Sequence, residues 1–177
     1  MGVSGVYACI RRVPDLVIST EWLVLVLLVV ANGTPILVQR LFGARFATPL
    51  DGGLRLGDGR YLFGPGKTIR GVVFSIVVTA LIGRLLGLGL GTGLLFGALT
   101  MAGDLSSSFI KRRLRIPSGG MALGLDQVPE SLFPLLGCMS ILGLDLTSVA
   151  VLVLAFLVLE LALSRLLHRL GIRDRPY

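Results

Sequence analysis

Histidine and cysteine are nearly missing from this chain of 177 residues. It has one histidine, His168 in the C-terminal tail, and two cysteines, Cys9 and Cys138, which lie far apart. Histidine-based acid–base catalysis and thiol nucleophiles are therefore not expected, because none of these residues has an obvious activating partner in the sequence. The cysteines also lack the spacing of a metal-ligand cluster, so both are expected to serve as small apolar residues.

Charged residues are scarce as well, at 15% of the chain, whereas hydrophobic residues make up 54%. A soluble globular domain carries roughly 25% charged residues. The composition therefore predicts an all-α polytopic membrane protein, with room for about five transmembrane helices of roughly 20 residues each. The net charge of +7 fits anionic lipid headgroups or phosphorylated substrates. Nucleic acid is a poor candidate partner, because the basic residues stand in blocks beside apolar segments.

The chain is expected to form a single integral membrane domain over residues 1–177. Residues 1–19 lack the features of a cleaved secretory signal, so they are expected to remain as an N-terminal segment. Polar and glycine-rich stretches separate some spans as long loops, whereas the other connections are tight hairpins. The spans are expected at residues 20–38, 71–88, 90–110, 125–142 and 147–167, and the two loops at about 39–70 and 111–124.

Several spans contain residues that disturb or tighten helix packing. The run Asn32–Pro35 is expected to kink the first span, and Pro129 and Pro134 are expected to bend the fourth. Glycines in the second and third spans recur at four-residue spacing, which lets helix backbones approach closely within one chain or in a possible homodimer. These glycines are Gly83, Gly87, Gly89, Gly93 and Gly97.

The distribution of basic residues predicts the orientation. Fourteen of the 17 Lys and Arg residues lie in the two long loops and the C-terminal tail, on one side of the membrane. Basic residues concentrate on the cytoplasmic side of membrane proteins. We therefore expect a multi-pass protein of the cell membrane, with the N-terminus outside and the C-terminus and both loops in the cytoplasm.

The stretch from Gly103 to Gln127 combines acids and bases at the edge of the membrane. Asp104 and Asp126 flank a basic loop and adjoin apolar segments, where an uncompensated acid is costly. If the third span continues as a helix, one face presents Asp104 together with hydroxyls and cations, which suits a metal-bound phosphate. A positive-inside loop flanked by two structural acids is the alternative. The residues expected on this face with Asp104 are Ser107, Ser108, Lys111 and Arg112.

A second basic block, GPGKTIRG, precedes the second expected span. It is not a P-loop, because Tyr61 stands where that pattern needs a glycine and no buried strand precedes it. It does present Lys67, Thr68 and Arg70 at a helix start, where backbone amides favour anions. Together the two blocks suit phosphoryl or nucleotidyl transfer, which depends on charge neutralisation by Mg²⁺ and by Lys or Arg. A phosphate monoester as nucleophile would need no general base.

These residues resemble the phosphatidate cytidylyltransferases. Gly103, Asp104, Leu105, Ser108, Lys111 and Arg112, followed by Asp126, are similar to that family's GD-L-x-x-S-x-x-K-R block and its later aspartate, and Pro65, Lys67, Thr68 and Gly71 resemble its P-x-K-T-x-E-G block. Arg70 stands where the wider family has glutamate, and Gln127 where it has arginine. With these departures and its short length, the chain looks most like the archaeal branch, the CDP-archaeol synthases.

The resemblance implies transfer of CMP from CTP to 2,3-bis-O-geranylgeranylglycerol 1-phosphate, with release of pyrophosphate and a requirement for Mg²⁺. Asp104 and Asp126 would hold the metal, and Lys111 would take part in catalysis. The residues that would contact the nucleotide or lipid phosphates are Lys67, Thr68, Arg70, Ser108, Lys111, Arg112 and Gln127.

Other functions remain open at this point. An ion-coupled or proton-conducting transporter is the main alternative, since acids in spans often serve ion movement. Its weakness is that both aspartates lie close to one membrane face and that five spans give no obvious inverted repeat. A CDP-alcohol phosphatidyltransferase is disfavoured because Asp51, Gly52 and Arg55 do not reproduce that family's spacing. A purely structural membrane subunit would leave both acid and base blocks unexplained.

Overall fold

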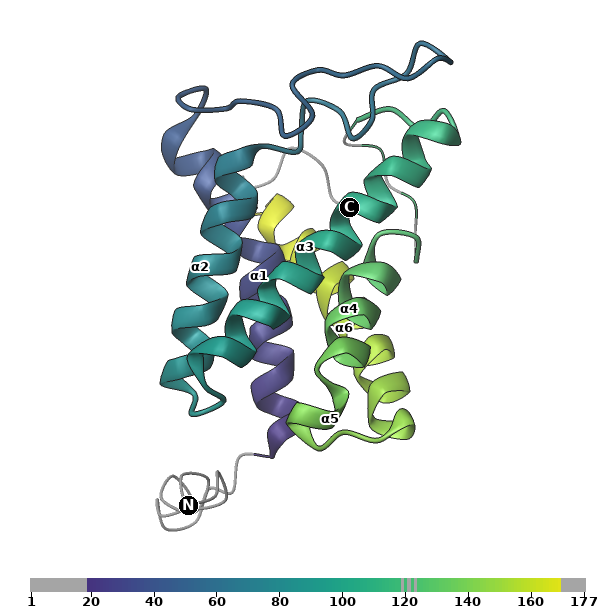
Figure 1. Ribbon diagram of the computed structural model, residues 1–177. Coiled ribbons are helices and arrows are strands. Elements are labelled where there is room, and N and C mark those ends of the chain that lie inside the picture. Colours follow the sequence, from purple (N-terminus) through teal and green to yellow (C-terminus); the bar gives the residue numbers. More distant parts are fainter. Residues whose placement is uncertain (1–18, 119, 121, 123, 170–177) are drawn as a thin grey trace.

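The computed structural model describes residues 19–118, 120, 122 and 124–169, and its regular structure is helical, as predicted. The N-terminal segment predicted over residues 1–19 and the tail beyond residue 169 therefore lie, apart from Ser19, outside the described residues. Helices α1 to α4 and α6 run side by side, and a long connection covers one end of them (Figure 1). The helices are α1 (Thr20–Phe42), α2 (Ile69–Leu85), α3 (Leu90–Arg113), α4 (Gln127–Gly137), α5 (Met139–Leu142) and α6 (Leu146–Arg169).

Three helices of the described chain are long and apolar enough to cross a membrane: α1, α3 and the part of α6 from Leu146 to Leu166. These correspond to the first, third and fifth predicted spans. Helix α2, with 17 residues, is at the lower limit of length for a span. The fourth predicted span is divided into α4 and α5 at Cys138. A multi-pass helical protein is confirmed, whereas the count of five spans stays a prediction.

Helix α1 continues through the run that was expected to interrupt it. Proline at position 35 has no N–H to donate to the carbonyl of Ala31, four residues earlier. The hydroxyl of Ser75 on α2, which is fully buried, donates a hydrogen bond of 2.6 Å to that carbonyl. A neighbouring helix thus satisfies the freed carbonyl, and α1 extends to Phe42.

Glycine lets α2 and α3 pack with their backbones in contact. A Cβ atom at Gly93 of α3 would lie 2.8 Å from the carbonyl oxygen of Thr79 and 2.9 Å from Cα of Ala80, both on α2. A Cβ at Gly83 of α2 would lie 2.9 Å from Cα of Gly93. The prediction of packing glycines is therefore confirmed within one chain for Gly83, Gly93 and Gly97, whereas Gly87 and Gly89 lie with positive φ in the hairpin between the helices. The hydrophobic core is formed by buried side chains of α1, α3, α4 and α6, among them Val24, Leu27, Leu28, Phe96, Leu135 and Phe156.

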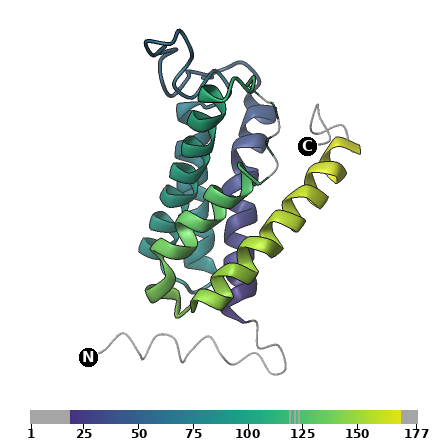
Figure 2. The same cartoon turned by 90° about the vertical axis from the view of Figure 1, so that its right-hand side faces the viewer.

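The connection between α1 and α2 folds into a compact unit, residues 48–68, which we call the lobe. Its two arms are joined at the base by hydrogen bonds from Leu50 N to Lys67 O (2.7 Å) and from Ile69 N to Thr48 O (3.1 Å). Nearer the tip, Leu62 N donates to Leu54 O at 2.9 Å. The lobe covers the end of the helices at which α3 ends, whereas α6 diverges from α1 towards that end (Figure 2).

Candidate functional site

A cavity of about 850 Å³ has walls formed by the lobe, the start of α2, and helices α1, α3, α4 and α6. Helix α1 contributes Asn32 and Pro35 among others, and α6 contributes Glu160, Leu161 and Ser164. All nine side chains predicted for the site from the sequence line this cavity. They are Lys67, Thr68, Arg70, Asp104, Ser108, Lys111, Arg112, Asp126 and Gln127.

The first ion pair joins the lobe to α3. Lys67 Nζ lies 2.5 Å from Oδ1 and 2.6 Å from Oδ2 of Asp104, and both side chains are largely buried. Burial on its own disfavours the charged ammonium, but Asp104 together with Glu130 and Asp126 outweighs this and raises the pKa of Lys67. The two sequence blocks predicted to face phosphate therefore meet directly, and Lys67 stays charged.

A second ion pair joins the end of α3 to the start of α4. Lys111 Nζ lies 2.7 Å from Oδ1 of Asp126, and both side chains are more than four-fifths buried. Lys67 and Lys111 are the only two lysines in the sequence, so each lysine is paired with one of the two predicted aspartates. Breaking a buried pair by removing one partner typically costs about 3–5 kcal/mol. A polyanion that replaced the aspartates around both lysines would keep the charges compensated.

Arg112 and Ser108 are buried on the cavity-facing side of α3, with exposed fractions of 8% and 3%. The Arg112 guanidinium lies beside the lobe, because its NH1 would be 3.2 Å from a Cβ atom at Gly64. Its buried Nε has no hydrogen-bond partner among the described residues. A buried donor without a partner is costly, so Arg112 is a strong candidate to bind an anion from the cavity.

The three remaining predicted residues also make local structural contacts. Thr68 is the N-cap of α2 and its hydroxyl accepts a hydrogen bond from Gly71 N at 3.3 Å. The Arg70 guanidinium donates to the carbonyl oxygens of Arg45 and Gly43, which fastens the start of α2 to the end of α1. Gln127 Oε1 accepts from Gly124 N at 2.8 Å.

Glu130 is a cavity residue that the sequence analysis did not assign to the site. It lies in α4, one helical turn after the N-cap residue Asp126, and is 7% exposed. Glu160 of α6 also lines the cavity. An acid within an apolar span is itself an indication of function, so both residues could have been identified from their place in the sequence.

Asp51 shapes the part of the lobe that carries Lys67. Its Oδ2 accepts hydrogen bonds from Phe63 N and Gly64 N at 2.9 and 3.0 Å, and its Oδ1 accepts one from Gly53 N at 3.0 Å. Burial opposes ionisation, but these amide donors outweigh it and lower the pKa of Asp51. The charged carboxylate is therefore the form that stabilises the lobe.

We expect Asp51→Ala to speed amide hydrogen exchange at Phe63 and Gly64 about tenfold, because hydrogen bonds to a charged acceptor contribute about 1.5 kcal/mol or more. The depressed pKa means that the stabilisation is complete above the ordinary carboxyl pKa of about 4 and is lost as the pH falls further. Acid should therefore loosen the lobe of the unaltered protein in the same way. Equal exchange in variant and parent at neutral pH would contradict this role.

Comparison with known proteins gives consistent matches. A family model described as CarS-like, CDP-archaeol synthase, matches residues 13–90 and 86–177. The chain is 40% identical over 112 residues to a CDP-archaeol synthase of Pyrobaculum arsenaticum, and 39% identical over 104 residues to one of Saccharolobus islandicus. These alignments cover 60% and 56% of this chain, and 66% and 59% of the relatives' own lengths.

A solved structure is similar as well. It is described as an intramembrane enzyme for archaeal membrane lipids biosynthesis, and it superposes with a TM-score of 0.64 at 31% identity. The match covers 77% of this chain and 90% of the other. The overall helical fold is thus similar to that of an experimentally determined intramembrane enzyme.

Proposed function

Because this chain belongs to the CDP-archaeol synthase family, we propose that it transfers CMP from CTP to 2,3-bis-O-geranylgeranylglycerol 1-phosphate. The products are CDP-archaeol and pyrophosphate. The observation that carries the proposal is the contact between Lys67 and Asp104, which unites the two motif blocks at one cavity. The family match also confirms the resemblance that those blocks indicated.

Asp104 and Asp126 would hold Mg²⁺ in this proposal. Mg²⁺ is usually bound by one or two protein carboxylates together with substrate phosphates and water, rather than by a complete protein cage. Two aspartates that line one cavity fit this pattern. Among the described residues no group of three or more His, Cys, Asp and Glu side chains could hold a metal alone, which agrees with an ion shared with the nucleotide. When bound, Mg²⁺ neutralises phosphate charge in the transition state.

The protein residues position anions and neutralise their charge. An oxygen of the lipid phosphate attacks the α-phosphorus of CTP, and the bond from that phosphorus to the oxygen bridging to the β-phosphorus breaks, which releases pyrophosphate. The attacking oxygen is already anionic, so no histidine is needed. Lys111 and Arg112 compensate the charge of the departing pyrophosphate, and Ser108 donates a hydrogen bond. Lys67, Thr68 and Arg70 bind phosphate from the lobe side, and Gln127 supports the turn before α4.

The isoprenoid chains need an apolar path between the bilayer and the cavity. We assign this path to the side between α1 and α6, where Pro35, Ile36 and Leu161 line the cavity and the two helices diverge (Figure 2). The start of α4 contributes polar side chains to the same cavity, among them Gln127 and Glu130. In this arrangement the lipid phosphate reaches the lysines while its chains remain in the membrane.

The topology proposed with this function has five spans, an external N-terminus and cytoplasmic loops. Arg60, Lys67, Lys111 and Arg113 all lie at the end of the molecule that the lobe covers, in keeping with a single basic face. Basic faces of membrane proteins are cytoplasmic, where CTP is found.

The reaction is tested by measuring pyrophosphate release from ATP, CTP, GTP and UTP with purified protein in detergent. Each nucleotide is combined with the archaeal ether-lipid phosphate, with a diacylglycerol phosphate, or with no acceptor. We expect release that depends on CTP, Mg²⁺ and the ether lipid. A protein that moves ions across liposomes but releases no pyrophosphate under any combination would instead be a transporter.

A further inference from the structure

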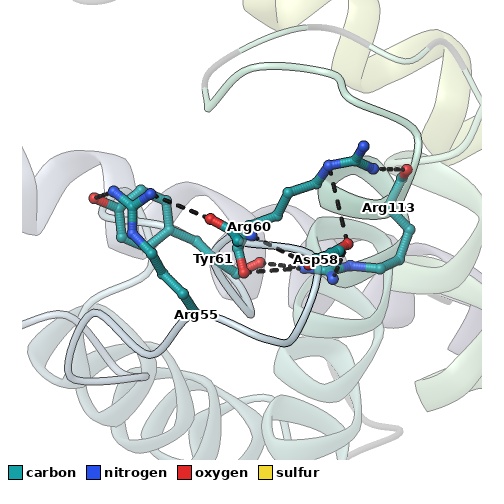
Figure 3. A network of polar contacts seen from close by, with 6 residues as sticks. Arg55, Asp58, Arg60, Tyr61 and Arg113 are labelled. Carbon is teal, nitrogen blue, oxygen red and sulfur yellow. Dashed lines mark hydrogen bonds and ion pairs between the residues drawn. The ribbon is translucent and has the colours of Figure 1, made fainter.

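The tip of the lobe is fastened to the last turn of α3 by two arginines that cross each other (Figure 3). Arg113 of α3 donates from NH1 to Asp58 Oδ2 at 2.6 Å and from NH2 to Tyr61 O at 2.6 Å. In the opposite direction, Arg60 NH1 of the lobe donates to Arg113 O at 2.6 Å. We call the contacts among Asp58, Arg60 and Arg113 the latch.

The latch satisfies groups that would otherwise lack partners. The carbonyl of Arg113 lies in the last turn of α3, where no following helical N–H is available to donate to it. The Arg60 guanidinium donates the hydrogen bond instead. Arg113 also lies over the ring of Phe109, with its Cζ 5.3 Å from the ring centroid. Within the lobe tip, Arg55 Cζ lies 4.3 Å from the Tyr61 centroid and Arg55 NH2 donates to Tyr61 Oη at 2.9 Å.

Hydrogen bonds hold successive residues of the lobe between the latch and Lys67. The carbonyl of Tyr61 accepts a hydrogen bond from Arg113 of the latch. The next residue, Leu62, donates its N–H across the lobe to the carbonyl of Leu54. The next two amides, of Phe63 and Gly64, are held by Asp51. At the end of the series Leu50 N donates to Lys67 O at 2.7 Å.

The lobe therefore forms ion pairs with α3 at two places nine residues apart in sequence, which is about 13 Å along a helix. One place is the latch at Arg113 and the other is the ion pair of Lys67 with Asp104. In the proposed reaction Lys67 exchanges its contact with Asp104 for contact with phosphate. The ion pair with Asp104 is then broken, whereas the ion pair of the latch continues to hold the lobe to α3.

We propose that Asp58, Arg60 and Arg113 are positioning residues that hold the lobe, and hence Lys67, at the cavity while Lys67 changes partner. The functional consequence rests on the role proposed above for Lys67. None of the three latch residues lines the cavity, so they act through the lobe and not by contact with substrate. A lobe that is docked for only a fraction of the time lowers apparent affinity by that fraction.

The test uses the fact that the sequence has only two lysines. Purified protein in detergent is treated with an amine-acetylating reagent, and the rates at Lys67 and Lys111 are followed by mass spectrometry. Asp58→Ala, which leaves α3 unaltered, and Arg113→Ala should each label Lys67 several times faster than the parent does. Lys111, whose ion pair is with Asp126 and not with the lobe, should keep its rate within about twofold and serves as the internal reference.

Arg115→Ala is the matched control, because Arg115 is an exposed arginine two residues beyond Arg113. Its Lys67 rate should equal that of the parent. Unchanged Lys67 labelling in Asp58→Ala and Arg113→Ala would overturn the proposal, and so would an equal acceleration at both lysines, which would mean general loosening. Labelling requires no turnover, so this result stands even if the proposed reaction is wrong.

If the reaction is as proposed, kcat/KM for CTP should fall about tenfold in Asp58→Ala and Arg113→Ala, mainly through a higher KM. Arg113→Lys, which retains the charge but not the paired donors, should recover only part of the loss. Faster labelling with unchanged kcat/KM would overturn the positioning role. The same result would leave the proposed function itself standing.

Discussion

Asparagine at Asp104 or Asp126 is expected to lower the rate of pyrophosphate release by about a hundredfold to a thousandfold while the protein stays folded. Each carboxylate lies against a lysine in the cavity and is proposed to hold Mg²⁺. An amide has nearly the same shape and still accepts a hydrogen bond from the lysine, but it carries no charge to bind the ion. The rate is measured at saturating CTP and lipid phosphate, with thermal unfolding in detergent recorded on the same samples.

Asp145→Asn provides the control for this loss of charge. Asp145 lies in the hairpin before α6, and its Oδ1 accepts a hydrogen bond from Ser148 N at 2.8 Å. Asparagine caps a helix about as well as aspartate does, so activity and stability should both be retained. Near-normal pyrophosphate release by both Asp104→Asn and Asp126→Asn would end the metal assignment. Alanine at the same positions should be at least as severe.

The predicted site residues were identifiable because each motif is local in sequence. Asp104, Ser108, Lys111 and Arg112 repeat at helical spacing, and the helical period alone gathers them on one face of α3. The position of Lys67 at the same cavity could not be predicted from helical spacing. It was predicted because both sequence blocks resemble the family's blocks and occur in the same order. Their roles towards substrate stay predictions.

Contacts between distant residues could not be predicted from the sequence. The latch joins Asp58 to Arg113, and no local pattern selects this partner among the many basic residues nearby. Nor could the sequence show how the carbonyl that Pro35 frees is satisfied, because its partner is Ser75 on another helix, and α1 continues past the proline. Tertiary contacts of this kind override local propensity, and they are visible only once helices are placed against each other.

Helices α3 and α4 pack closely at Gly103, the residue before Asp104. A Cβ atom at Gly103 would overlap the carbonyl oxygen of Pro129 and lie 2.8 Å from Glu130 N. The backbone of α4 therefore rests directly on α3 beside Asp104. This approach places Glu130 and the start of α4, with Asp126, at the same cavity as Asp104.

Gly103→Ala should accordingly force α4 away from α3, because the atoms it meets belong to backbone and cannot rotate aside. We expect a loss of about 1–3 kcal/mol in the free energy of unfolding. Pyrophosphate release should fall about a hundredfold, since displacements near 1 Å have such effects. Gly91→Ala in the same helix is the control, because no atom lies within 4 Å of its added Cβ. If both variants keep parental activity, the contact of α3 with α4 at Gly103 does not set the distance between the two aspartates.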